Sequence, residues 1–430
     1  MNRRILHLAI PSIVSNITVP LLGLVDVAIT GHMGDATYMA AIAVSSMVFN
    51  IIYWLFSFLR FGTGGMTAQA FGAKSDAECG NLMLRSQMVC FVIALLLCLI
   101  QTPILSLVLL VINPSVDLLP AIQRYYGICI FGTFPSLAMY AFNGWLVGMQ
   151  NTRLPMVISI TQNIVNILLS YTFVYHFGMK IEGVALGTLI AQWCGAVMAT
   201  VVILRNYRPL LLTVKMRTAL KLTEMKRFFT VNQMLFLRTL FLVAVNLYFI
   251  VAGARGGTVM LAVNSIMMQM FILFSYVMDG FAFAAEALCG RYYGANDKCN
   301  FRLALRYIWR WALLMTALFT LAYICFGDIF VGMLTDEMSV REAASDYLPW
   351  AIAIPACGIA AFVWDGVFVG MTQTRGMLAG TFAGAAVFFL LYFSLYSSLG
   401  NHALWLAFDA YLLMRGLVQH VVYIRTAKTC

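Results

Sequence analysis

Charged residues are scarce in this chain. Asp, Glu, Lys and Arg make up only 10% of its 430 residues, whereas 62% are hydrophobic. Soluble domains carry roughly 25% charged residues, so the composition excludes a soluble protein. The short alternating segments that the strands of a membrane barrel need are missing as well. Apolar stretches of about 20 residues or more recur instead, each long enough to cross a hydrocarbon core of about 30 Å as a helix. An all-α polytopic membrane protein is therefore predicted.

Motifs of catalysis and metal binding are also missing. The chain has no P-loop, no GxSxG and no HExxH, and its ten cysteines are scattered without a CxxC or Cys/His cluster. Scattered cysteines in apolar segments are interpreted as buried free thiols. No enzyme activity, metal site or cofactor is predicted. A polytopic membrane enzyme is the alternative from another class, but the histidines form no constellation with Asp, Ser or Lys: His7, His32, His176, His402 and His420.

Twelve membrane-spanning helices are expected. The "MNRR" start resembles the basic region of a signal peptide, but no A-x-A-like site follows it, so the first helix is expected to remain uncleaved. The predicted spans are 6–31, 38–70, 85–112, 122–149, 156–177, 183–205, 227–252, 258–292, 303–333, 345–371, 377–398 and 402–425.

Basic residues between these spans predict the orientation in the membrane. Most of them fall on the side of the N-terminus, and few fall on the other side, namely Arg124, Lys180, Arg255 and Arg341. The positive-inside rule then predicts that both termini lie in the cytoplasm. The chain is expected in the inner or plasma membrane. This topology explains the net charge of +10 without nucleic-acid binding.

The second half of the chain repeats the first at a constant shift in residue number, here called the repeat offset. "NGWLVGMQNTR" (143–153) returns as "DGVFVGMTQTR" (365–375), and "AFGA" (70–73) returns as "YYGA" (292–295). The same offset pairs Gly31 with Gly253, Gly34 with Gly256 and Phe49 with Phe271. Convergent chemistry at helix ends is the alternative explanation. A repeat of six helices predicts two lobes related by a pseudo-twofold axis along the membrane normal: residues 1–205, a basic cytoplasmic linker 206–226, and residues 227–430.

Six motifs carry a family resemblance. They are "LVDVAITGHMG", "FLRFGTGGMTAQAFGA" and "NGWLVGMQNTR" in the first half, and "FLRTL", "DGFAFAAEALCGRYYGA" and "WDGVFVGMTQTR" in the second. With these six motifs in this order, the chain resembles the multidrug and toxic compound extrusion (MATE) family of the MOP superfamily. Within that family it resembles the DNA-damage-inducible F (DinF) branch. The resemblance implies a secondary antiporter that alternates between outward-open and inward-open states.

The resemblance also implies a cation site in the first lobe. Asp26, Asn166 and Thr188 match the positions that related proteins use, but Ser170 stands where an Asp is expected. A hard cation such as Na⁺ prefers several anionic or carbonyl oxygens. The change to Ser170 therefore favours H⁺ as the coupling ion and leaves Na⁺ as the alternative.

Asp26 lies in the apolar run "PLLGLVDVAIT" with no basic residue nearby. Because desolvation favours the neutral acid, a carboxylate there can load a proton where water reaches it and release the proton on the other side. Pro11 and Pro20 precede it and predict a kinked helix. A carboxylate that only holds the first helix in place is the alternative.

Neutral polar residues accompany Asp26 in the first lobe. Asn163, Asn166 and Ser170 share one helix face, and Thr188 and Gln192 share another. These faces are predicted to line a hydrated cavity. The alternative is hydrogen bonding between helices, which contributes only about 0.6 kcal/mol on average.

The second lobe carries charges within its expected helices. Arg238 is predicted to pair with an acid, because an unpaired charge at a helix centre costs about 2.5–3.5 kcal/mol. The candidate acids of this polar network are Asp279, Glu286 and Asp365. The network is interpreted either as a fixed structural lock or as a second site for ion or substrate coupling.

The sequence as a whole predicts a proton-coupled exporter of organic cationic or amphipathic compounds, a monomer with small-molecule substrates and membrane lipid as its partners. A Na⁺-coupled exporter and a flippase of lipid-linked precursors are the alternatives. Flippases line their cavity with basic residues, which here enter the membrane only at Arg60, Arg238 and Arg415. Arg60 belongs to a family motif without an assigned role, and Asp409 and Arg415 are expected to be structural.

Overall fold

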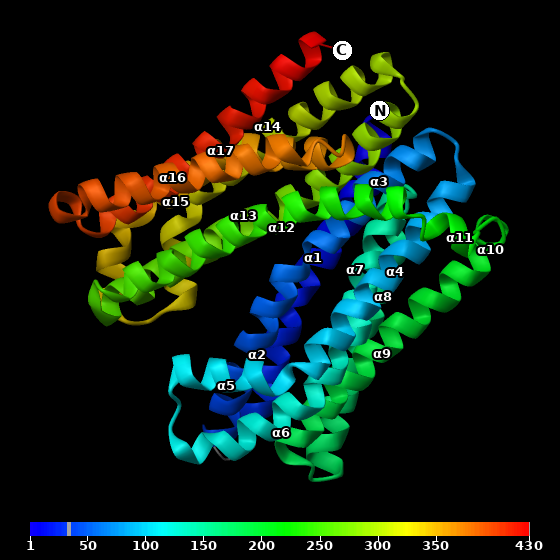
Figure 1. Cartoon of the computed structure of the whole chain (residues 1–430). Coiled ribbons are helices and arrows are strands. Elements are labelled where there is room, and N and C mark those ends of the chain that lie inside the picture. Colours follow the sequence, from blue (N-terminus) through cyan, green and yellow to red (C-terminus); the bar gives the residue numbers. More distant parts are fainter. Residues whose placement is uncertain (32–35, 430) are drawn as a thin grey trace. The chain divides into compact units, whose positions relative to one another are not determined.

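The computed structural model of the chain describes residues 1–31 and 36–429, with all of their side chains except those of 19–24, 26, 27, 36, 111 and 427–429. Within these residues every regular element is a helix (Figure 1). The first half contains α1 (Asn2–Gly31), α2 (Ala36–Phe56), α3 (Phe58–Gly72), α4 (Asp76–Leu99), α5 (Gln101–Ile112), η1 (Val116–Leu118), α6 (Leu119–Cys129), η2 (Ile130–Gly132), α7 (Thr133–Gly148), α8 (Arg153–Tyr171), η3 (Thr172–His176) and α9 (Lys180–Asn206). Two short helices follow, α10 (Arg208–Leu211) and α11 (Met216–Ala219), and then α12 (Leu222–Ala254), α13 (Gly257–Gly294), α14 (Lys298–Leu334), α15 (Met338–Gly370), α16 (Thr374–Leu399) and α17 (Asn401–Thr429).

Each predicted span corresponds to one helix or to consecutive helices. The divided spans are 38–70 (α2 and α3), 85–112 (α4 and α5), 122–149 (α6, η2 and α7) and 156–177 (α8 and η3). Pro103 lies in the first turn of α5, where a missing N–H is tolerated, and so it begins a new helix after Ile100. By length and apolar composition, nine stretches of the described residues are able to cross a membrane. The all-helical membrane fold is thus confirmed, and four of the predicted spans are divided in a way that hydropathy alone does not reveal.

The chain divides into two compact units. One consists of Val14–Phe229, and the other of Met1–Ile13 with Thr230–Cys430. In the first unit α3 packs on α7 and α8 packs on α9. In the second unit α13 packs on α15 and α16 packs on α17. These helices correspond to each other at the repeat offset, so each unit contains the same two helix packings.

The repeat extends to backbone conformation. Lys74 (φ 55°) and Asn296 (φ 55°) both follow a helix in the left-handed region, and so do Gln150 (φ 63°) and Thr372 (φ 54°). In all four cases the amide donates to the carbonyl three residues earlier. A left-handed residue after a helix end satisfies carbonyls that would otherwise lack a partner. Both halves therefore end equivalent helices with the same turn.

Close helix contacts repeat as well. A Cβ atom added to Gly148 on α7 would lie 2.7 Å from the carbonyl oxygen of Gly64 on α3. The equivalent atom on Gly370 of α15 would lie 2.6 Å from the carbonyl oxygen of Glu286 on α13. Only glycine permits this approach of two helix backbones, which is how small residues act at membrane helix interfaces.

The basic segment between the halves contains α10 and α11, which pack on α4. Arg85 of α4 is fully buried, and its Nε donates to the carbonyl oxygen of Ala219 at 2.9 Å. Its Nη1 also lies 3.3 Å from Oε1 of Glu78. A buried arginine thus attaches this segment to the Val14–Phe229 unit.

Candidate functional site

The unit Val14–Phe229 contains a polar cluster between α8 and α9, made of Asn166, Ser170 and Thr188. Asn166 Nδ2 donates to Thr188 Oγ1 at 2.9 Å. Asn166 is 1% exposed and Ser170 is 0% exposed. Oδ1 of Asn166 and Oγ of Ser170 are buried and accept no hydrogen bond from the described residues. Because buried polar atoms nearly always have partners, these two oxygens mark a place suited to a polar ligand.

Residues of α8 and η3 also hold α1. Asn163 Nδ2 donates to the carbonyl oxygen of Thr18 at 3.1 Å. The hydroxyl of Tyr175 donates to the carbonyl oxygen of Ile29 at 3.0 Å. Asp26 lies on α1 between these two attachment points, and its side chain is outside the described residues. The α1 backbone on both sides of Asp26 is therefore bound to the elements that carry the polar cluster or directly follow it.

Gln192 lies on α9, one turn after Thr188. Its Oε1 is buried and accepts no hydrogen bond within the described part of the chain. The side chain lies against Gly132 of η2, where an added Cβ atom would displace it. The cavity that the sequence predicts around these residues stays a prediction.

The second unit contains a buried charge network on three helices. Arg238 of α12 and Arg415 of α17 both donate through Nη2 to Oδ2 of Asp365 on α15. Gln419 Nε2 donates to Oδ1 of the same carboxylate at 2.7 Å. Residue exposures of 5% for Arg238, 7% for Asp365, 6% for Arg415 and 0% for Gln419 put the network inside the protein. Each carboxylate oxygen is thus engaged, and the two guanidinium groups exceed the one carboxylate by one positive charge.

The remaining candidates lie on α3, α13 and α17. Glu286 on α13 is 1% exposed, and Asp279 on the same helix is partly exposed. Arg60 on α3 lies with its Cζ atom 3.9 Å from the ring centroid of Phe61, a cation–π distance. Asp409 on α17 is buried, and its two carboxylate oxygens accept no hydrogen bond from the described residues.

Sequence reasoning did not assign Arg415 and Gln419 to the network. They are four residues apart on α17 and so share one helix face. That spacing was visible in the sequence, but which helix faces α12 and α15 was not.

Comparison with known proteins decides the family. The sequence profile of MatE matches residues 11–172 and 235–393. The chain belongs to the MatE family. It is 33% identical over 411 residues to the DNA damage-inducible protein F of Escherichia coli, covering 96% of this chain and 89% of that protein. It is also 24% identical to a probable multidrug resistance protein NorM of Thermotoga maritima, covering 80% of this chain and 74% of that one.

Solved structures of MATE transporters share the fold. The Vibrio cholerae MATE transporter VcmN superposes with a TM-score of 0.88 at 16% identity, over 100% of this chain and 97% of that one. The outward-facing conformation of a multidrug resistance MATE family transporter superposes with a TM-score of 0.88 at 18% identity. The superposition covers 99% of this chain and 96% of that one. The chain therefore has the fold of these transporters, and as a member of the MatE family it is a multi-pass membrane transporter.

Proposed function

We propose that this transporter exports organic cationic or amphipathic compounds in exchange for H⁺, and that Asp26 carries the proton. The proposed cycle alternates access between lobes 1–205 and 227–430, with the linker 206–226 and both termini in the cytoplasm. A monomer in the inner or plasma membrane suffices for this cycle, with small-molecule substrates and surrounding lipid as its partners.

The observation that carries this proposal is the chemistry of the α8–α9 polar cluster. Ser170, Asn166 and Thr188 offer hydroxyl and amide groups but no carboxylate, and the Asn166–Thr188 hydrogen bond occupies one of the oxygens. Neutral oxygens stabilise a dehydrated Na⁺ less than carboxylates do. A single acid beside neutral hydrogen-bonding groups suits reversible protonation.

The repeat supports the assignment of Asp26 to the same site as Ser170. At the repeat offset, Asp26, Asn166 and Ser170 correspond to Tyr248, Phe388 and Tyr392. The ring of Tyr248 lies 6.3 Å from that of Phe388 and 5.3 Å from that of Tyr392, measured between centroids. Where the second half has an aromatic contact, the first half has an acid and two polar residues.

For the second half, the proposal assigns the Arg238–Asp365–Arg415 network to a structural lock. Both oxygens of Asp365 accept hydrogen bonds from buried donors, two of which are cationic. Protonating that carboxylate would break these charge-assisted bonds inside the protein, where their loss is costly. Coupling is therefore assigned to the first half, where two oxygens of the polar cluster accept no hydrogen bond from the described side chains and backbone.

The test is dye efflux from proteoliposomes under separately imposed H⁺ and Na⁺ gradients. The native protein is expected to respond to the H⁺ gradient, and Asp26→Asn is expected to lose that response while reaching the membrane in normal amount. Asp117→Asn, at an exposed position of η1, is the matched control. Proton-driven efflux that persists in Asp26→Asn would contradict the role of Asp26. Efflux driven by Na⁺ alone would favour the Na⁺-coupled alternative.

A further inference from the structure

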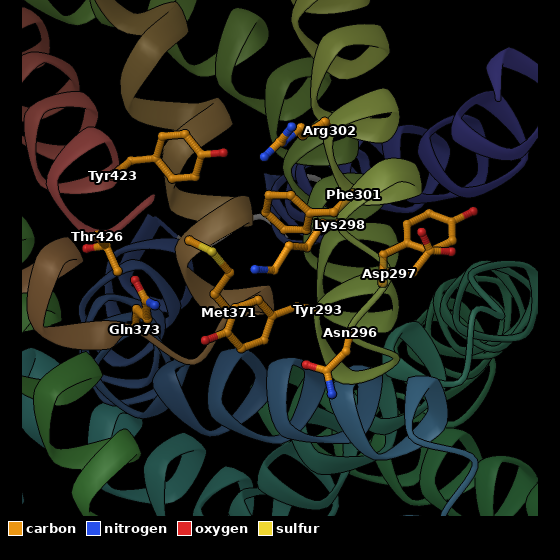
Figure 2. A pocket seen from close by; sticks show the side chains of 11 residues that line it. Tyr293, Asn296, Asp297, Lys298, Phe301, Arg302, Met371, Gln373, Tyr423 and Thr426 are labelled. Atoms are coloured by element: carbon orange, nitrogen blue, oxygen red, sulfur yellow. The ribbon is translucent and has the colours of Figure 1, made fainter. Parts of the chain in front are cut away.

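A cavity of about 400 Å³ lies at one end of the unit that includes Thr230–Cys430. Its walls come from the end of α13, the start of α14, the turn between α15 and α16, and the end of α17 (Figure 2). The basic residues of the sequence predict that this end faces the cytoplasm. Nothing in the proposed antiport uses this cavity.

Two basic residues of α14 give the cavity a positive charge. Lys298 and Arg302 are four residues apart on the first turns of the helix and therefore share one face. Figure 2 shows the Lys298 amine and the Arg302 guanidinium directed into the space between α14 and Tyr423. Arg302 is exposed and forms no hydrogen bond or ion pair with the described part of the chain. It is thus available to an anion.

A third cation supports the wall of the cavity. Arg4 of α1 donates from Nη1 to the hydroxyl of Tyr292 at 2.9 Å, and both residues belong to the same unit. Tyr292 lines the cavity, so this contact joins α1 to the wall.

The acid of the lining does not neutralise these cations. Asp297 accepts hydrogen bonds from Asn300 on both oxygens, from the backbone N at 3.0 Å and from Nδ2 at 2.7 Å. These hydrogen bonds lower the pKa of Asp297, so the carboxylate is ionised but engaged as the cap of α14. Figure 2 shows its side chain directed away from the Lys298 amine.

Apolar and aromatic side chains complete the wall. Tyr293 and Phe301 lie with ring centroids 6.4 Å apart. Tyr423 packs on Trp364 at 4.5 Å between centroids, which fixes its ring at the edge of the cavity. Met371 adds a flexible apolar surface. The site thus combines cations with a surface for a hydrocarbon or glycerol moiety.

We propose that this cavity binds a phosphate ester, with Arg302 and Lys298 contacting the phosphate and Tyr293, Tyr423 and Met371 contacting the attached group. Arginine suits phosphate because its planar donors match the phosphate oxygens. Basic pockets between helices at the cytoplasmic end of membrane proteins accept anionic headgroups, and the volume is that of a small-molecule site. The ester is either an anionic phospholipid headgroup or a soluble phosphate ester.

The experiment titrates the purified full chain in detergent and follows the midpoint of thermal unfolding, which rises with a bound ligand. Three probes separate the sources: short-chain phosphatidylglycerol, short-chain phosphatidylcholine and glycerol 1-phosphate. Phosphatidylglycerol is expected to raise the midpoint more than phosphatidylcholine. A rise with phosphatidylglycerol alone identifies a lipid headgroup, and an additional rise with glycerol 1-phosphate identifies a soluble ester as a ligand too.

Arg302→Gln is expected to weaken phosphatidylglycerol binding about tenfold, as the loss of one charge-assisted hydrogen bond predicts. Arg306→Gln is the matched control, because Arg306 is an exposed arginine of the same helix that does not line the cavity. Both substitutions are at exposed positions, so the midpoint without ligand should stay unchanged. Equal binding by the two variants, equal responses to the two lipids, or no response to any probe would overturn the proposal.

Discussion

Arg238 and Arg415 donate hydrogen bonds to the same oxygen atom, Oδ2 of Asp365. The three residues come from α12, α17 and α15, so one carboxylate joins three helices of the same unit. Without it, two guanidinium groups would face each other in a buried place. The lock therefore depends on the acid more than on either arginine.

Asp365→Asn is expected to destabilise the protein by about 3–5 kcal/mol, because it removes the counter-charge of the buried Arg415 guanidinium. Thermal unfolding in detergent should show a clearly lower midpoint. Arg415→Gln should cost less, since it leaves the Arg238–Asp365 pair intact. An Asp365→Asn midpoint equal to the native one would show that the lock does not stabilise the fold.

The same change at Asp409 is not expected to destabilise the protein. Asp409 is buried, and its oxygens accept no hydrogen bond within the described residues, so a charge there has a desolvation cost without compensation. Asp409→Asn, which removes the charge and keeps the shape, should leave the unfolding midpoint unchanged or raise it. A fall as large as that of Asp365→Asn would reveal a stabilising contact of Asp409.

Ser170→Asp is expected to make efflux responsive to a Na⁺ gradient. The substitution places a second carboxylate in the α8–α9 polar cluster, next to the amide oxygen of Asn166, and so adds an anionic ligand for a hard cation. Dye efflux from proteoliposomes under an inward Na⁺ gradient measures the effect. Ser170→Asn is the control of equal size without charge, and equal Na⁺ responses of the two variants would contradict the prediction.

Arg85→Ala is expected to release the segment that contains α10 and α11. The substitution removes the buried donor to the carbonyl oxygen of Ala219 and costs about 1–3 kcal/mol at that contact. Limited trypsin digestion should then cleave faster after Lys215, Arg217 and Lys221. Arg153→Ala, at an exposed position of α8, should digest like the native protein. Unchanged digestion of Arg85→Ala would show that other contacts hold the segment.

The sequence predicts the helical membrane fold well because a helix that crosses lipid must be apolar and about 20 residues long. Every predicted span has a counterpart among the helices, and the turns at Lys74 and Asn296 agree with the repeat offset found in the sequence. The breaks within spans, such as the one between α6 and α7, were not predicted. A break changes backbone hydrogen bonds but leaves the apolar composition of the span as it was.

The sequence predicts which polar residues share one helix face. It does not predict which residues of another helix they contact. The one-turn spacing of Asn166 and Ser170 places both on one face, and the hydrogen bond of Asn166 to Thr188 joins that face to α9. The partnership of Asp365 with Arg415 and Gln419 depends instead on how α15 packs on α17. That packing follows from small residues such as Gly416, where an added Cβ atom would lie 2.5 Å from Cβ of Ala360 on α15. The sequence signature of such a small residue does not specify a partner helix.

The two attachments of α1 have a mechanical consequence. Asn163 holds the carbonyl of Thr18 and Tyr175 holds the carbonyl of Ile29, and these points are about three helical turns apart. If both hydrogen bonds are kept, α1 changes its curvature between these two points, or it moves Asn163 and Tyr175 with it. Any change of curvature near Asp26 is thus either confined to those three turns or transmitted directly to α8 and η3. The proposed protonation of Asp26 would then displace the neighbouring helices whenever it changes the curvature of α1.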